Sequence, residues 1–108
     1  RAIEPVCQHP YKMWRKHGDE VVPLLLQPEY QPCHSLPTQT LPKVYVQNAS
    51  LEIAWVDTVI RTGTISGERI LAFETVGFEG VDLNTEYDWH YAEWLIETEQ
   101  VRLPVLVA

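Results

Sequence analysis

Glycine is scarce in this sequence of 108 residues, and its distribution excludes one class of site. The five glycines, at positions 18, 63, 67, 77 and 80, never cluster in front of a helix together with a lysine. A loop that cradles nucleotide phosphates needs such a cluster, because its backbone N–H groups must approach the phosphates closely. We therefore expect no phosphate-binding loop within these residues.

Long apolar runs are also missing, as is a basic segment followed by an apolar one at the start of the sequence. Cysteine occurs twice, at Cys7 and Cys33, and neither residue has a CxxC neighbour, which argues against a zinc site. We expect a reduced, cytoplasmic protein that does not enter a membrane. The two thiols are expected to be buried or inert, and a disulfide between them stays an alternative.

Basic residues are outnumbered by acidic ones, 8 against 15, which gives a formal net charge of −7. A phosphate backbone is repelled by such a field, so nucleic acid is excluded as the expected partner. The charge is unevenly distributed, since residues 11–17 are locally basic and residues 86–99 are acidic. A small anion suits the first region and a metal ion the second.

Hydrophobic residues make up 45% of the sequence, which predicts a packed core rather than disorder. The length suits one domain, residues 1–108. A domain this small buries a modest share of its surface, so a partner subunit would help to stabilise it.

Proline is concentrated in residues 27–42, which contain Pro28, Pro32, Pro37 and Pro42. Each proline fixes its own φ and favours extended geometry in the residue before it, so this stretch is predicted to be an extended arm. Residues 21–26 contain Pro23 and are predicted to form an edge strand or an irregular arm.

Elsewhere the apolar pattern predicts a mixed α/β fold. The last helix should bury one face, formed by Tyr87, Tyr91, Trp94 and Leu95, and should begin at Asn84 or Thr85. The other expected elements are a strand end in residues 2–6, strands over 44–46, 51–55 and 70–73, and helices over 11–16, 58–61 (capped by Asp57 and ended by Gly63) and 85–99.

Three local patterns then occur in order along the sequence. They are Gln8-His9-Pro10-Tyr11-Lys12-Met13-Trp14, then Gln39-Thr40-Leu41-Pro42 with Tyr45 and Asn48-Ala49-Ser50, and finally Gly80-Val81-Asp82-Leu83-Asn84-Thr85-Glu86-Tyr87-Asp88 running into Tyr91-Ala92-Glu93. With these patterns the sequence resembles the second half of the CMP-sialic acid synthetases (acylneuraminate cytidylyltransferases), a family that includes related nonulosonic acid cytidylyltransferases.

The resemblance implies a partial nucleotidyltransferase scaffold, a mixed α/β sheet with a proline-rich dimerisation arm and a C-terminal helix. Residues 9–42 would be the arm, which reaches across a homodimer, and residues 43–108 the C-terminal part of the scaffold. Family members activate a nine-carbon 2-keto acid sugar with CTP: the anomeric hydroxyl attacks the α-phosphorus, pyrophosphate leaves, and Mg²⁺ neutralises the developing charge.

Site residues carry over unevenly from this resemblance. Lys12, Gln39 and Asn48 match substrate-binding positions, and Asp82 matches the first carboxylate of a metal-binding pair. Asn84 stands where the family has a second carboxylate, which should weaken Mg²⁺ binding. Two family arginine positions hold Thr38 and Val46 and the position of a common glycine holds Ala49, so bidentate partners for the sugar carboxylate are missing.

Each of these residues also has a purely structural interpretation. Asp82 could serve a turn or a helix cap, and Lys12 could be a solvated surface lysine. His9 could order the start of the arm, and His90 with Glu86 and Glu93 could form a polar helix face instead of a metal site. Ser35 and Ser50 have no evident base nearby, so no catalytic residue is assigned.

The sequence therefore leads to two hypotheses. The first is the C-terminal part of a cytidylyltransferase that activates a sialic-acid-like sugar as its CMP derivative and is inactive without a CTP-binding half. The second is a homodimeric, non-catalytic binding or structural module derived from that family. The sequence does not identify the sugar acid.

Overall fold

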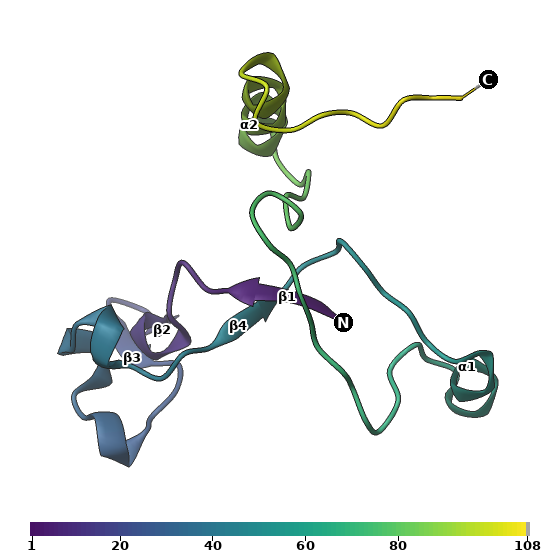
Figure 1. Cartoon of the computed structure of the whole chain (residues 1–108). Helices are drawn as coiled ribbons and strands as arrows, with labels where there is room; N and C mark the ends of the chain where they lie inside the picture. Colours follow the sequence, from purple (N-terminus) through teal and green to yellow (C-terminus); the bar gives the residue numbers. More distant parts are fainter. Residues whose placement is uncertain (108) are drawn as a thin grey trace. The chain divides into compact units, whose positions relative to one another are not determined.

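The computed structural model describes residues 1–107 and has mixed α/β content (Figure 1). Four single-turn 3₁₀ helices accompany the regular elements, and no helix within the described residues is long and apolar enough to cross a membrane. The strands are β1 (Ala2–Pro5), β2 (Trp14–His17), β3 (Glu20–Pro23), β4 (Tyr45–Gln47) and β5 (Phe73–Glu74), and the helices are α1 (Val56–Thr62) and α2 (Glu86–Glu97).

The strands form two sheets. In the larger sheet the order is β4-β1-β5, and β1 pairs with β5 in parallel, with Ala2 opposite Phe73 and Ile3 opposite Glu74. In the smaller sheet β2 and β3 are antiparallel, and His17 lies opposite Glu20. The expected strands at residues 2–6 and 44–46 are thereby confirmed, each to within one residue at either end.

The chain divides into two compact units. The first, called here the hairpin unit, is Pro5–Val46, and it contains all of the expected arm, residues 9–42. The second, the α2 unit, joins Arg1–Glu4 to Gln47–Ala108. Whether the arm reaches a second subunit stays a prediction.

The hairpin unit corrects one expectation, because residues 11–16 do not form a helix. Only Pro10–Lys12 makes a single 3₁₀ turn (η1), and the chain then enters β2. Gly18 and Asp19 link β2 to β3 as a two-residue loop, and Gly18 has a φ of +59°. Such a loop requires a positive φ at its first position, so local turn chemistry wins over the weak helix pattern. Residues 21–26 were expected to form an edge strand or an irregular arm; β3 begins at Glu20 and ends at Pro23, and residues 24–26 lie outside any strand.

Residues 27–42 contain no α-helix, but the expected extended geometry is wrong for much of this stretch. Nine of its residues form three 3₁₀ turns: η2 (Pro28–Tyr30), η3 (Cys33–Ser35) and η4 (Thr38–Thr40). Each turn begins at a proline or directly after one. Cys33 is buried, and its Sγ lies 3.4 Å from the carbonyl oxygen of Tyr11. Cys7 is exposed, and neither cysteine is in a disulfide.

Within the α2 unit, two expected strands are absent or shortened. Residues 51–55 alternate as a strand should, but they pair with no strand. Of residues 70–73, only Phe73 belongs to β5, and the segment is exposed rather than buried. Leu51 and Leu71 each accept one hydrogen bond from the start of the chain, but the backbone of Ile53 and Ile70 has no hydrogen-bond partner in the described chain. Alternation alone does not supply a neighbouring strand.

The first helix is confirmed with a shifted start, since Trp55 rather than Asp57 occupies the N-cap position of α1, and it makes no side-chain capping hydrogen bond. Asp57 instead pairs with Arg61 one turn later, at 2.8 Å. The helix ends at Gly63, as expected, in the left-handed conformation that glycine adopts without a steric cost.

The last helix is also confirmed, and Thr85 is its N-cap. The Thr85 and Asp88 side chains cap each other's backbone N–H groups, which is the reciprocal capping box. The expected buried face is wrong except at Leu95, because Tyr87, Tyr91 and Trp94 are exposed. The rings of Tyr91 and Trp94 stack on each other, with centroids 5.9 Å apart.

The capping box makes α2 sensitive to acid. The Thr85 hydroxyl, followed by the backbone N–H groups of Asn84 and Thr85, lowers the pKa of Asp88 below its ordinary value of 3.8. A carboxylate with a lowered pKa in the folded state stabilises that state above its unfolded pKa, and this contribution is lost as the pH falls through the folded pKa. We expect helicity, measured by far-ultraviolet circular dichroism, to decline below about pH 4.

Two variants separate this effect from general acid unfolding. Asp88→Asn should lose helicity at neutral pH and show a flatter acid transition. Thr85→Ala should cost about 1 kcal/mol through loss of the N-cap oxygen. A transition of unchanged steepness in Asp88→Asn would assign the acid sensitivity to other carboxylates.

Candidate functional site

A buried polar cluster joins β1, the end of β4 and β5 within the α2 unit. Asn48 is buried, and its Nδ2 donates to Thr75 Oγ1 at 3.0 Å and to Glu4 Oε2 at 3.4 Å. Its Oδ1 accepts from the backbone N–H of Ser50 at 3.1 Å. Thr75 is also buried, and its hydroxyl donates a hydrogen bond to the carbonyl oxygen of Ile3 at 3.2 Å. We call Glu4, Asn48, Thr75 and Gly80 the Asn48 cluster.

Gly80 belongs to this cluster because of how closely its backbone approaches it. A Cβ placed on Gly80 would overlap the carboxylate of Glu4 and lie 2.7 Å from Asn48 Nδ2. Side chains larger than hydrogen are therefore excluded unless the cluster shifts. The second and third patterns of the sequence, around Asn48 and Gly80, thus meet at one place.

Two residues beyond Gly80, Asp82 and Asn84 form a short hydrogen-bonded turn. Asp82 Oδ2 accepts from Asn84 Nδ2 at 2.9 Å, and Asp82 Oδ1 accepts from the backbone N–H of Leu83 at 2.9 Å. The backbone N–H of Asn84 donates to Asp88 Oδ2 at 3.0 Å. The turn is exposed and is anchored to the start of α2. The two residues expected to hold a metal are therefore adjacent in space.

This turn fits Mg²⁺ only as part of a larger site. It offers one carboxylate and one amide oxygen, and Mg²⁺ binds through one or two carboxylates together with waters and substrate phosphates. No group of three or more His, Cys, Asp and Glu residues within residues 1–107 could hold a metal by itself. The chemistry of the donors suits a metal that arrives with a phosphate ligand.

The other two expected substrate-binding residues lie in the hairpin unit. Lys12 is the last residue of η1 and is half-buried, and Gln39 is exposed in the middle of η4. His9, which is buried, accepts from the backbone N–H of Tyr11 through Nδ1, and its Nε2 lies 2.9 Å from the carbonyl oxygen of Pro42. His9 therefore orders both ends of the expected arm, residues 9–42.

His90 occupies an exposed face of α2 between two carboxylates. Its Nε2 lies 3.8 Å from Glu86 Oε1, and its Nδ1 lies 3.4 Å from Glu93 Oε2. All three side chains are solvated, which matches the interpretation as a polar helix face. His34 contacts Trp14 with ring centroids 4.7 Å apart.

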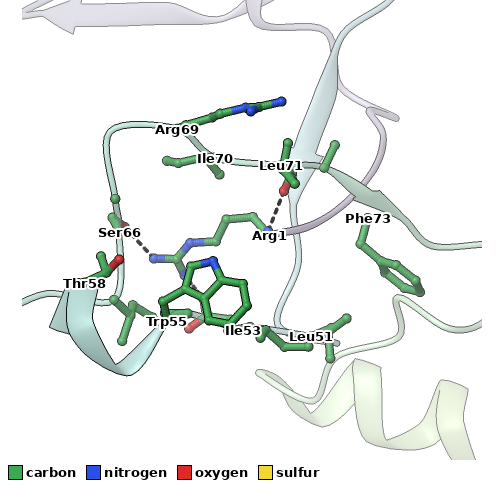
Figure 2. A pocket seen from close by; sticks show the side chains of 15 residues that line it. Arg1, Leu51, Ile53, Trp55, Thr58, Ser66, Arg69, Ile70, Leu71 and Phe73 are labelled. Atoms are coloured by element: carbon green, nitrogen blue, oxygen red, sulfur yellow. Dashed lines mark hydrogen bonds and ion pairs between the residues drawn. The ribbon is translucent and has the colours of Figure 1, made fainter.

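Sequence reasoning missed a cavity in the α2 unit. It has a volume of about 520 Å³, within the range of ligand sites, and lies between residues 51–55 and 65–73 (Figure 2). The guanidinium of Arg1 donates to Ser66 Oγ at 2.8 Å and forms an ion pair with Glu52. The alternating residues Leu51, Ile53 and Trp55, assigned to a strand, line one wall. The sequence shows the alternation of these residues, but it does not show that no strand pairs with them.

Comparison of the chain with protein-family models, curated proteins and solved structures found no match.

The Asn48 cluster should be a stability determinant. Asn48→Ala removes the donor to Thr75 and leaves buried polar groups without a partner, which costs about 1–3 kcal/mol. Gly80→Val should destabilise the protein as well, because its side chain would displace Glu4 and Asn48. Urea unfolding measures both changes. Ala49→Val, at an exposed neighbour, is the matched control and should leave the midpoint unchanged.

Proposed function

We propose that the chain is the C-terminal part of a cytidylyltransferase that activates a sialic-acid-like sugar as its CMP derivative. In this proposal it supplies the side of the active site that binds the acceptor sugar and Mg²⁺. The glycine-rich, basic part that holds the CTP phosphates is not among these 108 residues. The chain by itself is then a binding partner in catalysis and not a complete enzyme.

The observation that carries the proposal is the meeting of two of the three resembling patterns. The resemblance rests on the order of separate segments, and segments that form one site should lie together. Gly80 packs against Asn48 and Glu4, and Asp82 follows Gly80 by two residues. The buried amide of Asn48 thus lies in the same cluster as the residue that leads into the expected metal turn.

Asp82 would hold the magnesium ion through its carboxylate, and Asn84 would add a neutral oxygen. When bound, the ion would neutralise negative charge that develops on the phosphates during nucleotidyl transfer. Asn84 now donates to Asp82, so its amide must turn to present oxygen to a cation. A single carboxylate also implies weaker binding than a pair would give.

The proposed class of sugar follows from two arginines that the family resemblance implies and this chain lacks. Thr38 and Val46 stand where the family resemblance implies arginines, and neither can form a bidentate contact with a carboxylate. The proposed acceptor is therefore a nonulosonic acid whose carboxylate is bound by other groups. Lys12 and Gln39 are the polar residues of the hairpin unit assigned to this task.

Complementation tests the proposal. Mixed with a separate polypeptide that carries the nucleotide-binding half of a CMP-sialic acid synthetase, the chain should yield CMP-sugar and pyrophosphate. Asp82→Ala should lower kcat/KM by about 100-fold or more, since the metal supplies several kcal/mol of charge stabilisation. Asn84→Asp should tighten Mg²⁺ binding.

Two controls sharpen this experiment. Asp57→Ala removes an exposed carboxylate that pairs with Arg61 on α1, and it should leave the activity unchanged. Calorimetry of the chain alone with CTP and Mg²⁺ should show no binding. Clear binding of CTP by the 108 residues, or full activity of Asp82→Ala, would contradict the proposed division of labour.

The second candidate is a homodimeric module without catalysis, and exposed apolar residues in the hairpin unit favour a dimer in either case. Light scattering should report about twice the monomer mass of 12.5 kDa. Replacing Val21 with Lys should shift the protein towards monomer, because charge in an apolar contact is costly. A strict monomer at high micromolar concentration counts against both candidates. The exposed apolar residues of the hairpin unit that favour a dimer are Val21, Val22, Leu24, Leu25 and Leu26.

A further inference from the structure

The first residues of the chain form a central strand with hydrogen-bonded neighbours on both sides. On one side, the backbone nitrogen of Ala2 donates to Leu51 at 3.1 Å. On the other, the backbone nitrogen of Arg1 donates to Leu71 at 2.9 Å, and that of Phe73 donates to Arg1 at 2.9 Å. Both neighbouring segments therefore bond to β1 at its N-terminal end.

The hydrogen bonds between β1 and residues 71–75 recur every two residues. Arg1 bonds to Leu71 and Phe73, and two residues later Ile3 accepts from Thr75 at 2.9 Å. In a parallel ladder each step of two residues on one strand matches two on the other. A strand residue placed one such step before Arg1 would donate to the carbonyl of Arg69 and accept from the N–H of Leu71. Within residues 1–107, these two groups have no hydrogen-bond partner.

The cavity described above lies at this position, between residues 51–55 and 69–73 (Figure 2). The backbone N–H and carbonyl of Ile53, on the opposite wall, also lack a hydrogen-bond partner in the described chain. The Arg1 side chain runs between the two walls and ends at Ser66. Two segments with unpaired backbone groups, at Ile53 and at Arg69 and Leu71, therefore line the same cavity, which the Arg1 side chain enters.

The side chains of the two walls are apolar but solvated. Trp55 is 85% exposed, Ile53 80% and Leu71 68%. The walls of the cavity thus belong to a surface that another polypeptide segment would cover.

We propose that the cavity is the binding site of one further β-strand, an extended apolar segment of polypeptide that continues the line of β1. The segment bonds to Arg69 and Leu71 on one side and to Ile53 on the other, and it displaces the Arg1 side chain. It joins residues 51–55 and 70–73 into the sheet, which accounts for their strand-like sequences. Its assignment to the nucleotide-binding half of the enzyme rests on the proposed function.

The experiment places a strand of known sequence in the cavity. Six residues, Val-Thr-Val-Thr-Val-Thr, are added directly before Arg1 of the full chain, and Gly-Ser-Gly-Ser-Gly-Ser is added in a matched control. Amide hydrogen exchange then reports on Leu71 and Ile53. We expect exchange at both amides to slow by about 10-fold or more with the Val-Thr extension only, because strand pairing protects N–H groups.

Paired substitutions test whether the walls of the cavity bind the added strand. Leu71→Lys and Ile53→Lys should abolish the protection. Leu103→Lys and Ile60→Lys should preserve it, because these residues are similarly exposed (67% and 76%) and do not line the cavity. Equal exchange with both extensions, or equal effects of the paired substitutions, would overturn the proposal.

A separate measurement tests the assignment of the strand. In the complemented mixture, the amides of Leu71 and Ile53 should become protected by the nucleotide-binding half. Protection by the extension without any CMP-sugar synthesis in the mixture would leave the strand site standing and reject the proposed function. Synthesis with both amides still exchanging rapidly would reject the strand site.

Discussion

The hydrogen bonds on both sides of β1 are the constraint on which the α2 unit depends. A strand in the middle of a sheet must satisfy N–H and carbonyl groups along two edges, and here the neighbours come from residues 47–51 and 71–75. These segments are far apart in the sequence, and β1 bonds to both of them. The Asn48 amide reinforces the same junction, because it bonds to Glu4 of β1 and to Thr75 beside β5.

The candidate site follows from that junction. Gly80 can approach the Asn48 cluster because it has no side chain, and the chain then turns through Asp82 and Asn84 into α2. The capping box at Thr85 and Asp88 holds the far end of this turn. The Asp82 carboxylate thus lies between a buried polar cluster and a helix terminus, and it accepts hydrogen bonds from Leu83 and Asn84.

Local chemistry explains which elements the sequence could predict. The α2 start and the Gly63 end depend on neighbouring residues, and both were identified from those residues. The strand expected at residues 51–55 and the helix expected at residues 11–16 failed for opposite reasons. The first has the right alternation and no pairing neighbour, and the second has weak helical character and a better alternative in the Gly18 turn. The site was predictable as separate residues, but the contact between Gly80 and Asn48 depends on the fold, and no sequence pattern encodes it.

The two cysteines differ in a way that has a practical consequence. Cys7 is exposed, whereas Cys33 is buried beside the Tyr11 carbonyl. Thiolate reactivity requires access as well as charge, so a maleimide dye should couple at one defined position per folded chain. That position lies outside the cavity walls and the Asp82 turn. A fluorophore attached there would therefore label the hairpin unit at a single residue that does not line the cavity.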